Sequence, residues 1–119
     1  MRIELIIDLS RILHFYGDIP ETFDAPAGSY ERHELTFDPD EYEDIFDYDF
    51  VEPVDKLCGA LIDRGDVDYL TANQCERLVP WLEKRLERPC PYPLDTFYPK
   101  LLEFARRAIE LGTGVVVDL

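Results

Sequence analysis

The stretch FDPDEYEDIFDYDF, residues 37–50, constrains the fold most, because it interleaves seven carboxylates with six apolar or aromatic side chains and contains no basic residue. Only a conformation that puts the two kinds of side chain on different faces can bury one kind without the other. Asp38 is a suitable helix N-cap, Pro39 suits the first helical position, and Glu41 stands three residues after the cap. The pattern predicts a short helix over about residues 39–48. Its narrow apolar face would consist of Tyr42, Ile45 and Phe46.

The acidic excess lies in the first part of the chain. Residues 1–70 account for the whole net charge of −14, with 19 Asp and Glu against 5 Lys and Arg, whereas residues 71–119 carry 7 of each. The segment from Glu34 to Asp55 holds ten acids and no base. Adaptation to high salt would instead spread the acids over the whole chain. So large a negative charge repels a phosphate backbone, and we therefore expect no binding of DNA or RNA.

The apolar periodicity indicates a single α+β domain over residues 1–119. Alternating apolar residues at positions 3, 5 and 7 indicate an N-terminal strand. Two β-favouring segments around a proline-glycine turn indicate a hairpin over residues 19–37, and the C-terminal VVVDL indicates a buried strand. We therefore expect a small, mainly antiparallel sheet with four to five helices packed on one side.

The other expected helices are bounded by capping residues, glycines or prolines. Leu61 would belong to the buried face of the helix that Pro53 opens. Thr71 and Gln74 form a capping box at the start of the next helix, which Pro80 should kink or interrupt. These helices would span about residues 8–17, 53–65, 71–87 and 95–111.

The N-terminal and cysteine patterns are those of a cytoplasmic protein. Glu4 and Asp8 break the apolar run that a signal peptide would need, and no run of about 18 apolar residues is present to span a membrane. Cys58, Cys75 and Cys90 are odd in number, lie far apart and lack the spacing of zinc ligands. We expect three reduced thiols and no disulfide.

Known catalytic, cofactor and metal patterns do not fit the sequence. A calcium loop starting at Asp38 would place Tyr42 at a ligand position and Glu43 where the loop needs glycine. Cys90 has only the two histidines of the chain as possible catalytic partners. The sequence contains no glycine-rich phosphate loop. We therefore expect neither an enzyme nor a metal site, and no cofactor.

Three explanations can account for the acidic segment: solubility, adaptation to salt, or a basic protein partner. Like charges three or four residues apart on a helix cost about 0.2–0.5 kcal/mol per pair, and a basic partner would relieve this repulsion. Tyrosines interleaved with the acids could anchor such a partner. We therefore expect a basic protein to dock on residues 34–52, with the carboxylates facing outward. The residues expected at this interface are Asp40, Glu41, Tyr42, Glu43, Asp44, Asp47, Tyr48 and Asp49, with Tyr30 on the hairpin.

In size, acidity and single-domain α+β character, the chain resembles the immunity proteins that bacteria make against nuclease toxins. The resemblance implies an inhibitor whose acidic surface occupies the basic cleft of its nuclease partner. An alternative is a small-molecule-binding domain or an enzyme, with a pocket between the sheet and the helices. The segment PCPYP, residues 89–93, and Trp81 would line that pocket.

Overall fold

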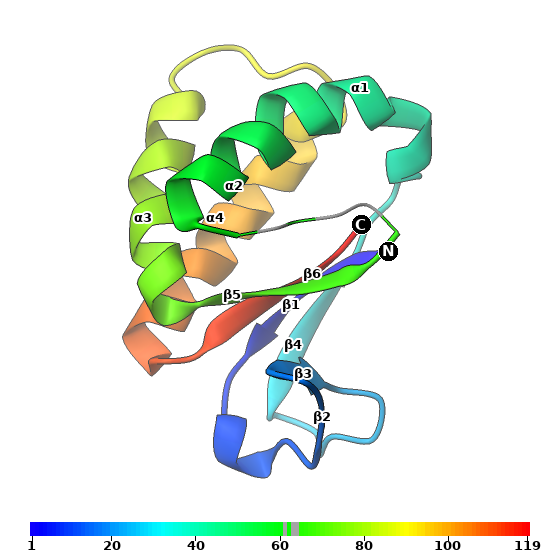
Figure 1. Ribbon diagram of the computed structural model, residues 1–119, viewed down its shortest axis with the longest axis vertical. Helices are drawn as coiled ribbons and strands as arrows, with labels where there is room; N and C mark the ends of the chain where they lie inside the picture. The colour runs from blue at the N-terminus through cyan, green and yellow to red at the C-terminus, as the bar shows by residue number, and fades with distance from the viewer. Residues whose placement is uncertain (61, 63–64) are drawn as a thin grey trace.

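A four-stranded sheet divides the molecule into a helical layer and a hairpin layer (Figure 1). The computed structural model describes residues 1–60, 62 and 65–119. Neighbouring strands, in the order β4-β1-β6-β5, are all antiparallel, so the expected α+β class and antiparallel sheet are confirmed. The first and last strands pair with each other at the centre of the sheet. The strands are β1 (Arg2–Ile6), β4 (Tyr30–Glu34), β5 (Val67–Thr71) and β6 (Gly114–Asp118).

Three continuous helical segments of the described chain cover one face of this sheet (Figure 1), which corrects the expected number of four to five. The first segment, called the acidic helix below, runs without a break through four short elements. None of the helices among the described residues has the length and apolar character needed to cross a membrane. The acidic helix comprises the 3-10 turn η2 (Pro39–Tyr42), α1 (Glu43–Phe46), the π-helical turn η3 (Asp47–Val51) and α2 (Glu52–Cys58), and the other two segments are α3 (Ala72–Arg85) and α4 (Leu94–Leu111).

The acidic helix is continuous because its buried residues recur at every fourth position. A strict repeat of four drifts around an α-helix of about 3.6 residues per turn. The wider turn η3, in which the N–H of Glu52 bonds to the carbonyl of Asp47, brings the repeat back toward the core. Pro53 follows that turn inside the helix, instead of opening a separate helix. The buried residues of the repeat are Phe46, Phe50, Val54 and Cys58.

The acidic helix ends earlier than the sequence pattern suggests. Gly59 terminates it in the left-handed conformation, with φ of 64°, which glycine adopts without steric cost. Gly65, the expected stop, lies beyond this end. Leu61, expected on the buried face, lies outside the described residues.

Helix α3 begins with the expected capping box and then continues through Pro80. The Thr71 hydroxyl accepts a hydrogen bond from the backbone N–H of Gln74, and the Gln74 side chain accepts one from the N–H of Thr71 at 2.9 Å. An interruption at Pro80 is wrong, because the helix runs on beyond it. Proline removes one helical hydrogen bond. The helix continues despite this loss, because Leu78 and Leu82, on either side of Pro80, are fully buried in the core.

The segment after β1 forms a hairpin, and the helix expected over residues 8–17 is wrong. Aromatic residues such as Tyr16 favour strands, and Gly17, with φ of 61°, supplies the left-handed conformation that a two-residue turn needs. The hairpin expected over residues 19–37 is also wrong. Strand β3 pairs with β2, and β4 pairs with β1. The elements are the 3-10 turn η1 (Leu9–Arg11), β2 (His14–Tyr16) and β3 (Ile19–Glu21).

The β2–β3 hairpin covers the face of the sheet opposite the helices (Figure 1). A small apolar cluster, separate from the main core, lies there. Beside it, Glu4 is 1% exposed, and its carboxylate accepts hydrogen bonds from Arg2 Nε at 3.1 Å, Arg32 Nε at 2.9 Å and Thr22 Oγ1 at 2.7 Å. Paired in this way, a buried carboxylate is tolerated, and it ties the chain after β3 to the sheet.

Burial of Cys58 and Cys75 should make them slow to react in the native protein. Burial raises the pKa of Cys58, and it raises the pKa of Cys75 to about 12, so both thiols stay protonated at about pH 8, where the thiolate is the reactive form. Cys90 is only partly buried. We expect an alkylating reagent followed by mass spectrometry to label Cys90 first, and all three cysteines once the protein is unfolded without reductant. A single reactive thiol in the unfolded protein would contradict this, because it would require a disulfide.

Candidate functional site

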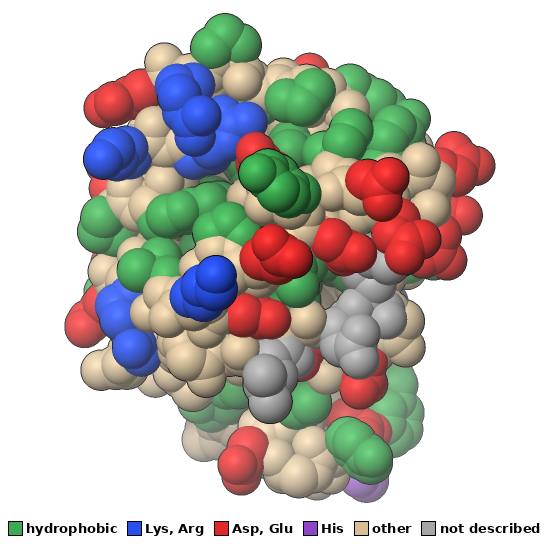
Figure 2. Space-filling model, turned by 45° about the horizontal axis from the view of Figure 1, so that its top comes forward, with side chains coloured by type: hydrophobic (Ala, Val, Ile, Leu, Met, Phe, Trp, Pro, Cys, Tyr) green, Lys and Arg blue, Asp and Glu red, His purple; other side chains and the backbone are tan. Residues whose placement is uncertain are grey.

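The acidic helix presents most of its carboxylates to solvent. Phe46 and Phe50 hold its inner side in the core at 0% exposure, as expected for Phe46, whereas Tyr48 projects outward and is 80% exposed. Asp47 is partly exposed. Figure 2 shows the acidic side chains gathered on one side of the molecule, and the basic side chains at the other end of the same face. The exposed carboxylates of this helix are Asp40, Glu41, Glu43, Asp44 and Glu52.

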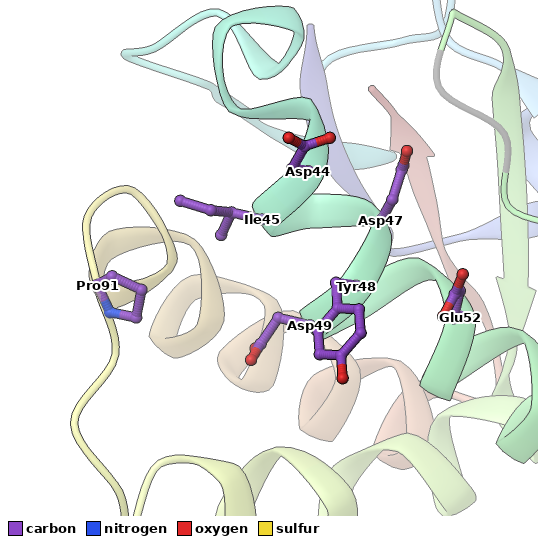
Figure 3. Close-up of a pocket in the computed structure, with 7 residues that line it drawn as sticks. All are labelled: Asp44, Ile45, Asp47, Tyr48, Asp49, Glu52 and Pro91. Carbon is purple, nitrogen blue, oxygen red and sulfur yellow. The ribbon is translucent and has the colours of Figure 1, made fainter.

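A groove of about 510 Å³ runs along the outer side of the acidic helix (Figure 3). The acidic helix forms one wall, and Pro91, from the loop between α3 and α4, forms the other. Ile45 points toward Pro91 across the groove. Four acidic residues therefore line the groove, together with an apolar strip. Its lining residues are Asp44, Ile45, Asp47, Tyr48, Asp49, Glu52 and Pro91.

Asp49 lines the groove and is also bound from within the protein. Its Oδ2 accepts a hydrogen bond from Arg85 Nε in α3 at 2.9 Å and another from the hydroxyl of Tyr98 in α4 at 2.6 Å. The Asp49 side chain is 28% exposed. It departs from the expectation that the carboxylates all face outward, because it is part of the structure that holds the helix in place.

Arg85 is the functional residue that the sequence reasoning missed. Its side chain is 7% exposed, and Nη1 also donates to the backbone carbonyls of Arg88 at 3.4 Å and Pro89 at 3.3 Å. Hydrogen bonding to Asp49 raises the pKa of Arg85, while burial opposes this, and burial is the main cause of the raised pKa of Tyr98. A signal was present in the sequence, because Arg85 continues the three- and four-residue spacing of the apolar face of α3.

The structure brings together some of the expected tyrosines and separates others. Tyr48 lines the groove. Tyr42 is partly buried in an aromatic cluster, with ring centroids 6.2 Å from Phe37 and 5.7 Å from Tyr92, so only part of its surface is open to a partner. Tyr30 packs in the small cluster on the opposite face of the sheet, so the structure does not join it to the acidic helix.

The space between the sheet and the helices, where the alternative function needs a pocket, holds the main apolar core. Phe97, Leu101 and Val117 are among the residues buried there. The two features proposed to line that pocket lie elsewhere, since Pro91 borders the groove and Trp81 lines a separate surface hollow. Among the residues that the structure describes, no group of three or more His, Cys, Asp or Glu side chains is arranged to hold a metal ion.

No protein family, curated protein or solved structure matches this chain. What the protein does must therefore be inferred from the shape and charge of its surface.

Replacing Asp49 should destabilise the protein, whereas the same change at Asp44 should not. In Asp49→Asn the buried guanidinium of Arg85 loses its countercharge, and a hydrogen bond to a charged group contributes about 1.5–3 kcal/mol. Asp44→Asn removes an exposed charge from a crowded acidic surface. We expect thermal melts to show a fall in Tm of roughly 5–10 °C for Asp49→Asn and no fall for Asp44→Asn. Equal melting temperatures for the two variants would contradict the structural role of Asp49.

Proposed function

We propose that the protein docks a basic protein partner through residues 34–52 and acts as an immunity-type inhibitor of a cationic, nuclease-like toxin. The groove carries this proposal, because four acidic residues line it together with an apolar strip and an 80% exposed tyrosine. A lysine or arginine side chain has the same two-part character, with an apolar stem and a charged head. The stem would lie against Ile45 and Pro91, and the head would lie among the carboxylates.

The charge distribution supports a fast association with such a partner. The segment from Glu34 to Asp55 holds ten acids and no base, and five of these carboxylates are exposed on the acidic helix. Complementary potentials raise association rates, and the gain falls with ionic strength. The cleft of a nuclease is basic because it binds phosphates, so it offers the matching potential.

The groove is also organised before any partner arrives. Asp49 is held by Arg85 and Tyr98, so little side-chain entropy remains to be lost there on docking. Both donors use Oδ2. Among the described residues no donor reaches Oδ1, which is therefore available to a cation of the partner.

A variant that combines Asp44→Asn, Tyr48→Ala and Glu52→Gln should lose the partner and keep its stability. All three side chains are exposed, and an anchoring tyrosine typically contributes about 2 kcal/mol or more to binding. The wild type and the variant are immobilised and offered the same extract of the native host, and retained proteins are identified by mass spectrometry. We expect the wild type to retain a basic protein that raised salt elutes, and the variant not to retain it. Calorimetry with the purified partner then measures the loss of affinity.

A matched control removes the same charges and an exposed tyrosine elsewhere. Tyr16→Ala, Glu76→Gln and Glu110→Gln are exposed positions outside the acidic helix, and this variant should retain the partner. Equal loss of the partner in both variants would mean that net charge alone causes binding. Full retention by both would mean that the acidic helix is only a solvated face, and either result would overturn the proposal.

A further inference from the structure

A second hollow lies beside the C-terminal turn of α3, and it has the opposite charge. Its volume is about 300 Å³, within the usual range for small-ligand sites. Among the described residues no carboxylate lines it, although the chain has 26 acids and only 12 Lys and Arg. The residues that line this basic hollow are Trp81, Lys84, Arg85 and Arg88.

Two of the cations in the basic hollow have no ion-pair partner among the described residues. Lys84 and Arg88 are exposed, and their side chains form no ion pair or hydrogen bond within residues 1–60, 62 and 65–119. Other arginines on the helices are paired, such as Arg106 with Glu83 at 3.2 Å and Arg107 with Glu31. In the described part of the chain, the hollow therefore keeps two cations that no acidic side chain pairs with.

Arg85 adds a fixed donor to the basic hollow. Its side chain is 93% buried, being 7% exposed, and the hydrogen bonds that it makes in the described part of the chain use Nε and Nη1. Nη2 is left for a ligand. Because Asp49 and two carbonyls already hold the guanidinium plane, a ligand that bonds to Nη2 would not have to immobilise a flexible side chain.

Trp81 gives the hollow a rigid aromatic wall. Its ring packs edge-on against Tyr98, with centroids 5.8 Å apart, and at a tilt against Phe50, with centroids 6.4 Å apart. It is only partly buried, so part of the indole remains available. An aromatic or apolar moiety can stack on such a surface.

We propose that the basic hollow binds a single phosphate or carboxylate group that is attached to an aromatic or apolar moiety. Lys84, Arg88 and Nη2 of Arg85 bind the anionic group, and Trp81 contacts the apolar part. Asp49 of the acidic helix is paired with Arg85 at 2.9 Å, which offsets its charge, and charges more than about 8 Å from the bound anion are largely screened at physiological salt. A long polyanion would still be repelled by the net charge of −14.

The chain has one tryptophan, so its fluorescence reports directly on the basic hollow. Phenyl phosphate and benzoate serve as anionic probes, and benzyl alcohol serves as the neutral control. We expect a saturable change in fluorescence with the two anions, weaker at high salt, and none with benzyl alcohol. In Lys84→Gln/Arg88→Gln the dissociation constant should rise about two- to fivefold for each charge removed. A control variant, Lys56→Gln/Arg106→Gln, loses the same charge elsewhere and should bind as the wild type does.

Two results would overturn the proposal: an equal response to benzyl alcohol, or unchanged anion binding in a Lys84→Gln/Arg88→Gln variant whose melting curve shows that it is folded. A blocked tripeptide, acetyl-Gly-phosphotyrosine-Gly-amide, distinguishes the source of the group. Tighter binding than phenyl phosphate points to an anion carried on a protein, and weaker binding points to a free small molecule. Asp44→Asn/Glu52→Gln should leave anion binding unchanged, so this site and the acidic groove can fail independently.

Discussion

One oxygen of Asp49 accepts hydrogen bonds from Arg85 and Tyr98, and the three helical segments meet at this point. Arg85 lies in α3 and is 7% exposed, Tyr98 lies in α4 and is buried, and Asp49 comes from the wide turn of the acidic helix. A buried guanidinium without a countercharge is strongly unfavourable. Arg85 can therefore remain buried only while the acidic helix keeps its register, and that register fixes where the outward carboxylates lie.

The same ion pair separates two surfaces of opposite charge. Asp49 lines the acidic groove and Arg85 lines the basic hollow. Because the pair neutralises itself, the potential on each side is set by more exposed groups, such as Asp44 in the groove and Lys84 in the hollow. A partner that fills the groove would meet one carboxylate, that of Asp49, already held in position, while a small anion in the hollow would meet a guanidinium already held in position.

Local patterns in the sequence predicted most of the helical layer and little of the hairpin layer. The capping box of Thr71 and Gln74 located α3, and the alternation of acids with aromatics located the outward face of the acidic helix. Residues 8–17 fit a helical spacing equally well, but Gly17 and its neighbours formed a turn because the hairpin covers the sheet. Asp49 could not be separated from its exposed neighbours, since its role depends on Arg85, 36 residues away. Only contacts made by the folded chain distinguish it.

A double-mutant cycle on Asp49→Asn and Arg85→Met tests this account most directly. Each single variant leaves one partner without the other, whereas the double variant removes both. If the pair holds the acidic helix against α3, the free energy of unfolding of the double variant should be higher than the sum of the single effects predicts, by about 1–3 kcal/mol. Additive effects of the two substitutions would contradict the account, because they would mean that the acidic helix keeps its position without this ion pair.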